Sequence, residues 1–180
     1  MILVVDMNRE KDSLESEEFA YPIVSICNKM KKCDLIHYID VDAGVVKNYD
    51  RVILSGTPLG ETGYIKEIER FDWIKSLEKP LIGICAGMQV IGLLFGSELK
   101  ECQEIGMTYI DVVKENPLFP SNIMVYELHK YAIKPSGRFE VLAKSEKCVQ
   151  AIRHKDKELY GLLFHPEVRN RDILKRFIMM

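Results

Sequence analysis

Apolar and polar positions follow two different periods in the first half of the chain. Short apolar stretches predict strands, because a strand buried on both faces is apolar at nearly every position. These predicted strands are Ile2 to Val5, Leu35 to Val41, Arg51 to Leu54 and Leu81 to Ile84. Between them, apolar residues at helical spacing predict the helices Ala20 to Lys32, Tyr64 to Glu78 and Met88 to Phe95. This alternation predicts an α/β fold with a mostly parallel central sheet and helices on both faces.

The pattern changes after Gly96, where short strand-like runs are separated by turn residues. The predicted strands are Thr108 to Val113, Ile123 to Leu128, Phe139 to Ala143, Val149 to Arg153 and Leu159 to Phe164. Asp156 and Lys157 predict a hairpin between the last two. We therefore expect a partly antiparallel extension, followed by a terminal helix from Arg171 to Ile178. Without repeats or linkers, residues 1–180 are expected to form one domain.

Charged residues dominate the segment from Met7 to Phe19, which we predict to be a solvent-facing loop that runs into the first helix. No function is assigned to this segment. His37 and His154 stand among charged or strand residues and are predicted to lie at the surface.

Composition excludes several classes of function. A hydrophobic fraction of 47% and a charged fraction of 29% are typical of a globular protein. The formal net charge of −2 indicates no nucleic-acid or anionic-membrane partner. No apolar stretch approaches the length of a membrane span, so a cytoplasmic protein is expected. The five cysteines show no Cys-x-x-Cys spacing, so we expect neither a disulfide framework nor a metal site.

The segment Pro80 to Gln89 carries the main chemical signal. An apolar run enters the sequence Gly-Ile-Cys-Ala-Gly and is followed at once by a helical pattern, which is typical of a nucleophile elbow with Cys85 at its tip. A thiol at a helix N-terminus is favoured as thiolate. The backbone N–H of Ala86 is placed to bind an oxyanion. The alternative is a buried structural cysteine in front of a core helix.

The second signal, His165-Pro-Glu167, lies near the C-terminus. Residues two apart in an extended segment face the same side, so the imidazole and the carboxylate are expected to lie together. A carboxylate that orients a histidine is what a cysteine nucleophile's general base requires. By itself the motif is also compatible with a surface strand end.

Together, Gly-Ile-Cys-Ala-Gly-Met-Gln and His-Pro-Glu resemble the motifs of the class I (triad) glutamine amidotransferases. The resemblance covers essentially the whole chain and is strongest to the amidotransferase subunits of GMP synthase. The supporting stretches are Val52 to Gly56, Gly106 to Thr108, Asn116 to Phe119 and Phe139 to Ala143. It implies the class I amidotransferase-like (flavodoxin-like) fold and a catalytic triad of Cys85, His165 and Glu167.

The resemblance assigns further residues to the site. The turn Ser55-Gly56-Thr57 supplies the second oxyanion N–H, from Gly56 or Thr57. Gln89 helps to hold the substrate, although a solvent-facing glutamine is the alternative. His129 corresponds to a histidine near bound glutamine. This chain departs from the family at Thr57, where a glycine is usual, and at Leu128 and Tyr131, where Ser and Asp are usual.

The implied activity is hydrolysis of L-glutamine to glutamate and ammonia through a thioester, without a metal or organic cofactor. In the GMP synthase-like assignment, the ammonia passes to a separate synthetase subunit of the ATP-pyrophosphatase type in purine biosynthesis. The stretch Glu127 to Tyr131 is then a candidate docking face. Two alternatives remain open: a stand-alone γ-glutamyl hydrolase or peptidase, and a non-catalytic regulatory module.

Overall fold

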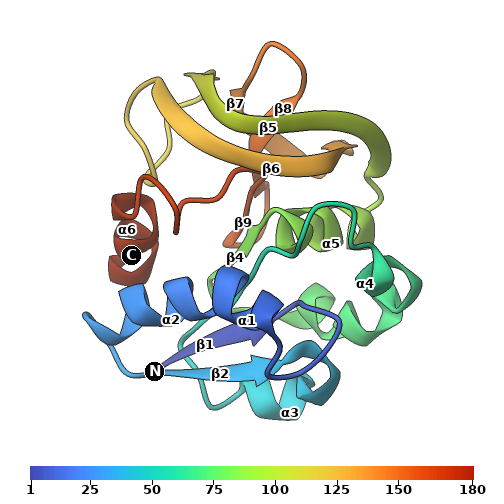
Figure 1. The fold of residues 1–180 in the computed structure, drawn as a ribbon, viewed down its shortest axis with the longest axis vertical. Coiled ribbons are helices and arrows are strands. Elements are labelled where there is room, and N and C mark those ends of the chain that lie inside the picture. Colours follow the sequence, from blue (N-terminus) through green and yellow to red (C-terminus); the bar gives the residue numbers. More distant parts are fainter.

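A nine-stranded sheet runs through the molecule in the order β2-β1-β3-β4-β9-β8-β7-β5-β6 (Figure 1), and the computed structural model describes all residues from 1 to 180. The strands are β1 (Ile2–Asp6), β2 (Cys33–His37), β3 (Arg51–Leu54), β4 (Leu81–Ile84), β5 (Glu98–Val112), β6 (Ile123–Lys134), β7 (Phe139–Lys144), β8 (Val149–His154) and β9 (Leu159–Leu162). The α-helices are α1 (Leu14–Phe19), α2 (Tyr21–Asn28), α3 (Ala43–Val46), α4 (Gly63–Lys66), α5 (Ala86–Leu94) and α6 (Asp172–Met179). Two 3-10 helices, η1 (Tyr38–Asp40) and η2 (Ile68–Ser76), complete the chain.

Strands β2, β1, β3, β4 and β9 are parallel and form the half of the sheet that the alternating pattern predicts. Alternate residues of each strand enter different cores, so both faces are apolar. On β1, Leu3 and Val5 belong to the core beneath α5 and η2. Ile2 and Val4 belong to the core beneath α2 and α6. The predicted α/β architecture with helices on both faces is therefore confirmed.

Strands β8, β7, β5 and β6 are antiparallel to their neighbours and form the predicted extension. The predicted β8–β9 hairpin is present. Strands β5 and β6 are longer than expected and make a curved two-stranded ribbon above α5 and β9 (Figure 1). This ribbon returns the residues after Val125 to the carboxyl end of β4, where the elbow lies.

The predicted helix from Tyr64 to Glu78 is wrong in type. The chain forms the short helix α4 and then the 3-10 helix η2. The reason lies in the apolar spacing, because Ile65, Ile68, Phe71, Ile74 and Leu77 recur every third residue. A 3-10 helix has three residues per turn, so this spacing places them on one face.

The segment Met7 to Phe19 is also more structured than predicted. Helix α1 begins after Ser13, whose side chain accepts a hydrogen bond from the backbone N–H of Ser16. The Ser16 hydroxyl in turn donates to the buried carboxylate of Asp6 at 2.5 Å. The helix expected from Ala20 to Lys32 is shorter, since α2 runs from Tyr21 to Asn28.

Two histidines predicted to lie at the surface are buried instead. His37 ends β2, and its Nε2 lies 2.8 Å from the carbonyl oxygen of Asn8. His154 ends β8 and packs edge-on against the rings of Phe95 and Phe139. Its burial lowers the pKa of His154, which favours the neutral ring.

None of the helices combines the length and the apolar character that a membrane span requires.

Candidate active site

Cys85 lies at the sharp turn between β4 and α5, as the elbow pattern predicts. Its backbone has φ 48° and ψ −101°, a conformation that side chains other than glycine rarely adopt. The turn is possible because its neighbours are small. A Cβ on Gly83 would lie 2.3 Å from the carbonyl carbon of Gly87, and a Cβ on Gly87 would lie 2.7 Å from that of Leu54. The strained residue is thus the nucleophile candidate itself.

The thiol of Cys85 is 5% exposed and lies 3.8 Å from the carbonyl oxygen of Leu128 on the ribbon. Ala86 is the first residue of α5, where the backbone N–H has no acceptor within the helix. The helix N-terminus therefore presents a free donor and a partial positive charge beside the sulfur.

His165 and Glu167 lie together, although the segment between them is a turn rather than the extended strand that the motif predicts. The distance from His165 Nδ1 to Glu167 Oε1 is 2.7 Å, and both side chains are buried. The backbone N–H of His165 donates to the carbonyl of Tyr126 at 2.9 Å, which ties the turn to β6. The other ring nitrogen, Nε2, faces Cys85 and has no hydrogen-bond partner of good geometry.

The electrostatics of His165 favour its charged form. Burial by itself lowers the pKa of the imidazole, but the negative charge of Glu167 and the interaction with the Cys85 thiol outweigh it. The pKa of His165 is raised well above its ordinary value as a result. The three residues are therefore arranged to hold a proton on the imidazole beside the sulfur.

The turn after β3 brings Gly56 against the other two elements. A Cβ at Gly56 would lie 2.6 Å from Cε1 of His165 and 3.5 Å from Cβ of Cys85. Thr57 has no positive φ, since the residues other than glycine in that region are Asp12, Cys85 and Asn170. A β-branched residue is thus compatible with this turn, and its amide remains available as a donor.

Cys85 opens into a narrow hollow between the loop after β3 and the ribbon. The residues around it are Thr57, Pro58, Leu59, Gly60, Glu61, Tyr64, Cys85, Gln89, Leu128, His129, Lys130 and Tyr131. The hollow leaves about 10 Å³ for the centre of a water molecule, which is room for about one water. It must widen to admit a larger ligand.

Gln89 lies one helical turn after Cys85 and is 3% exposed, so the solvent-facing alternative is wrong. Its Oε1 accepts a hydrogen bond from the Tyr64 hydroxyl at 2.5 Å. Its Nε2 donates to the Tyr131 carbonyl at 3.0 Å. The amide thus bridges α4 and β6 across the hollow.

His129 borders the hollow, but its imidazole is turned to the inner face of the ribbon. Nδ1 lies 2.9 Å from the Cys102 carbonyl oxygen. Nε2 lies 3.2 Å from Glu127 Oε2 and 3.5 Å from Glu104 Oε2. The ring is fully buried there, so the expected contact of this side chain with substrate has no geometric support.

Two residues near the site have no role in the sequence-based predictions. The apolar pattern places Tyr64 in a core helix, and only the fold shows that its hydroxyl binds Gln89. Glu127 is predicted only as part of a docking stretch, yet its side chain is fully buried. Burial raises the pKa of the Glu127 carboxyl, while His129 and His165 oppose the shift. The sequence contains no local signal for either contact.

Comparison with known proteins gives consistent matches. The family model described as glutamine amidotransferase class-I matches residues 18–178. A subunit of the glutamine-hydrolyzing GMP synthase of Methanocaldococcus jannaschii is 39% identical over 143 residues, which are 73% of each chain. The protein of the same name from Pyrococcus furiosus is 32% identical over 165 residues, covering 79% of this chain and 87% of that protein.

Solved structures agree with the sequence matches. A crystal structure described as a GMP synthase subunit from Thermoplasma acidophilum superposes with a TM-score of 0.83 at 26% identity, covering 99% of this chain and 93% of that one. A glutamine amidotransferase from Thermotoga maritima gives a TM-score of 0.71 at 24% identity and covers 99% of this chain and 81% of its own. The second likeness concerns the fold alone.

Proposed function

The chain belongs to the class-I glutamine amidotransferase family, and we propose that it hydrolyses L-glutamine with Cys85, His165 and Glu167 as its catalytic triad. The observation that carries this proposal is the arrangement of the three side chains. A strained thiol lies at a helix N-terminus, and a buried imidazole beside it is hydrogen-bonded to a carboxylate at 2.7 Å.

In the proposed reaction, the Cys85 thiolate attacks the side-chain amide carbon of glutamine. The negative charge on the carbonyl oxygen is bound by the N–H of Ala86 and that of Thr57 or Gly56, each donor contributing about 3 kcal/mol to the barrier reduction. His165 protonates the departing ammonia, which leaves a thioester. The imidazole then removes a proton from water, which attacks the thioester and releases glutamate. Glu167 keeps the imidazole oriented throughout.

We further propose that the ammonia passes to a separate synthetase subunit, in keeping with the name that the relatives carry. An exposed apolar surface supports this docking. Three cross-strand pairs of the ribbon face outward, and we call them the apolar ladder: Ile105 with Leu128, Met107 with Tyr126, and Tyr109 with Met124. Directly opposed residues point to the same side. Leu128 also borders the catalytic hollow, so the ladder reaches the site itself.

The ladder refines the docking face predicted from Glu127 to Tyr131. Glu127 and His129 are buried, which leaves Leu128, Lys130 and Tyr131 as the accessible members of that stretch. The narrow hollow supports activation by the partner. Gln89 is held by Tyr64 and Tyr131, and glutamine enters only when that bridge opens. A synthetase that moves β6 on docking would open it.

The proposed acceptor is that of the GMP synthase reaction in purine biosynthesis, in line with the named relatives. All five cysteines are free thiols, which supports a reducing compartment, and we place the activity in the cytoplasm.

The test is labelling with 6-diazo-5-oxo-norleucine, a glutamine-mimicking electrophile, followed by mass spectrometry. We expect one adduct on Cys85, slowed by added glutamine and absent in Cys85→Ala. Cys27→Ala is the matched control and should label normally, since burial raises the pKa of that thiol to about 12. Glutaminase activity that survives Cys85→Ala would rule out the mechanism. Faster hydrolysis of larger γ-glutamyl amides would favour the stand-alone hydrolase, and an unreactive Cys85 would favour the regulatory module.

A further inference from the structure

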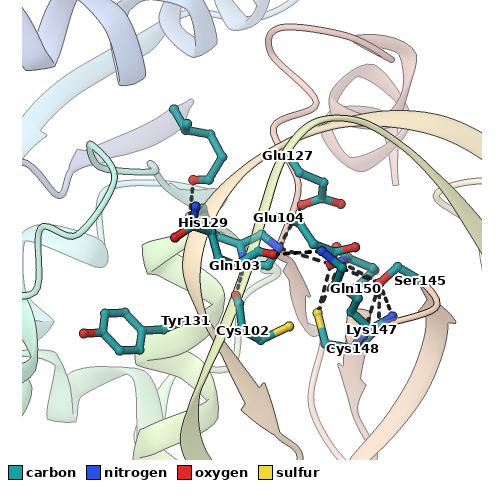
Figure 2. Close-up of polar contacts among 12 residues, drawn as sticks. Cys102, Gln103, Glu104, Glu127, His129, Tyr131, Ser145, Lys147, Cys148 and Gln150 are labelled. Atoms are coloured by element: carbon teal, nitrogen blue, oxygen red, sulfur yellow. Dashed lines mark hydrogen bonds and ion pairs between the residues drawn. The ribbon is translucent and has the colours of Figure 1, made fainter.

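A second group of reactive side chains lies on the inner face of the ribbon, where it meets the start of β8 (Figure 2). We call it the inner cluster, and its members are Cys102, Glu104, Glu127, His129, Ser145, Cys148 and Gln150. The proposed glutaminase mechanism uses none of these side chains. In Figure 2 the ring of Tyr131 points away from the cluster, which lies on the other side of β6 from the catalytic hollow.

Strand register assembles the cluster from distant segments. The β5–β6 pairing is irregular between Glu101 and Glu104, and after this bulge Glu104 stands directly opposite His129. Bulges commonly re-aim side chains in this way. Cys148 arrives from the turn before β8, so its thiol and that of Cys102 face one another (Figure 2).

Three potential metal-ligand atoms converge in the cluster. The Cys102 Sγ, the Cys148 Sγ and a Glu104 carboxylate oxygen all lie within 4.8 Å of one another. The Cys148 Sγ is 3.2 Å from Glu104 Oε2. The Nε2 of His129 lies 3.5 Å from the same oxygen, which adds a fourth possible ligand. The thiols are only half-buried, so an ion can reach them from solvent.

The protonation of His129 supports its role as a ligand. A carbonyl oxygen only accepts hydrogen bonds, so the contact of Nδ1 with the Cys102 carbonyl at 2.9 Å requires the proton on Nδ1. The neutral ring then presents the lone pair of Nε2 to the cluster. A metal-ligating histidine usually has this arrangement, with its second nitrogen donating to a backbone carbonyl.

Buried polar atoms in the cluster lack partners. Nε2 of His129 makes no hydrogen bond, and neither does either carboxylate oxygen of Glu127, although both side chains are fully buried. Unsatisfied buried polar groups are rare and costly. A cation between the imidazole and the carboxylates would satisfy Nε2 and offset the negative charge of Glu104 and Glu127.

We propose that the inner cluster binds one divalent transition-metal ion of the zinc class through Cys102, Glu104, His129 and Cys148. Sulfur, nitrogen and carboxylate ligands in fourfold coordination are those that Zn²⁺ prefers. Binding replaces two S–H protons, which pass to solvent, by two metal–sulfur bonds. Ser145 and Gln150, which donate to Glu104 at 3.0 and 2.7 Å, would orient its carboxylate. The ion would join β5, β6 and the start of β8.

The proposal is tested on the full chain, reduced, stripped with a chelator and titrated with Co²⁺ as a spectroscopic probe. We expect one Co²⁺ per chain, with thiolate charge-transfer absorption in the near ultraviolet and visible bands of a tetrahedral site. Zn²⁺ should displace it. Cys102→Ser and Cys148→Ser should each abolish the charge-transfer band or reduce it by about half, and His129→Gln should weaken binding by about tenfold or more.

Controls separate this site from the other thiols and from the glutaminase. Cys33→Ser removes a cysteine that lies in a different core, and it should leave the cobalt spectrum unchanged. The titration is repeated in Cys85→Ser, so that its result does not depend on the catalytic thiol. Circular dichroism of each variant shows that it is folded, and Glu104→Gln provides a second variant that keeps both thiols.

Three outcomes would overturn the proposal. The first is an absence of the thiolate–cobalt band in the reduced protein. The second is a spectrum that survives Cys148→Ser and Glu104→Gln unchanged. The third is an imidazole signal of His129, seen by nuclear magnetic resonance, that remains doubly protonated when Zn²⁺ is added, because a proton rather than a metal would then satisfy Nε2.

Discussion

Individual residues of the proposed triad are held by partners that only burial makes effective. Imidazole and carboxylate are both removed from water, so their attraction is screened little and the ring keeps its proton above the usual range. The cost of removing one partner is correspondingly high. Breaking a buried ion pair typically costs about 3–5 kcal/mol, because the other charge stays buried and unpaired.

This pairing predicts a pH-dependent stability. The folded-state pKa of His165 is raised, so its contribution is fully present below the unfolded value of about 6.5. It is lost as the pH rises through the higher folded value. We therefore expect Glu167→Gln to lower the free energy of unfolding by about 3 kcal/mol at pH 6 and by progressively less at higher pH.

Urea unfolding of both proteins between about pH 6 and about pH 10 measures this difference. Glu140→Gln is the control, because Glu140 pairs with Lys114 at the surface, where ion pairs contribute little. A stability difference that grows with pH would contradict the assignment of the charge to His165.

At the scale of elements, the site is built where three loops meet at the carboxyl ends of parallel strands. The loops after β3, β4 and β9 supply Gly56, Cys85 and His165, and β3, β4 and β9 are adjacent in the sheet. Ligands bind at this edge in open α/β sheets, because the loops converge there. The ribbon closes the site from the opposite side through the Leu128 carbonyl.

The close approach of these loops predicts the effect of Gly56→Ala. The added methyl group would lie 2.6 Å from the His165 ring and force it away from Cys85. Misplacement of a catalytic group by about 1 Å can lower the rate about 100-fold. We expect kcat/KM for glutamine to fall by about that factor, with the fold retained.

The matched control is Gly137→Ala, since a Cβ there would meet no atom within 4 Å and its φ is not positive. Steady-state glutaminase assays compare the two variants. Equal activity of Gly56→Ala and the unmodified chain would show that the imidazole can shift without loss of function.

At the scale of the whole molecule, the exposed apolar ladder distinguishes the ribbon from the rest of the surface. Ile105 and Tyr109 are each 55% exposed and stand next to Met107 on one outward face. Contiguous exposed apolar patches on a protein of this size indicate an interaction site. The position of the ladder beside the catalytic hollow suits a partner that receives ammonia.

Met107→Asp is predicted to weaken docking of the synthetase partner, because it places a charge at the centre of the ladder. We expect binding to be weaker by about tenfold or more, measured by titration calorimetry, and loss of the stimulation of glutaminase activity by the partner. The basal activity of the free chain should not change. Leu14→Asp is the control, because Leu14 is 78% exposed on α1 and outside the ladder. Equal loss in both variants would exclude the ladder as the docking face.

The sequence by itself determined the chemistry and the parallel half of the fold. Strand β3 was predicted over its full range, and Cys85, His165 and Glu167 were identified from motifs a few residues long. Such predictions succeed because the strained elbow and the buried parallel strands each require particular residue types within a short segment.

Only the tertiary structure decided which distant residues meet. The curved ribbon buried His129 against Glu104 and brought Cys102 within reach of Cys148, although neither pair is close in the sequence. It also exposed the ladder and placed the carbonyl of Tyr131 on Gln89. These contacts depend on the register of long strands and on a bulge, and both are set by the packing of the whole sheet.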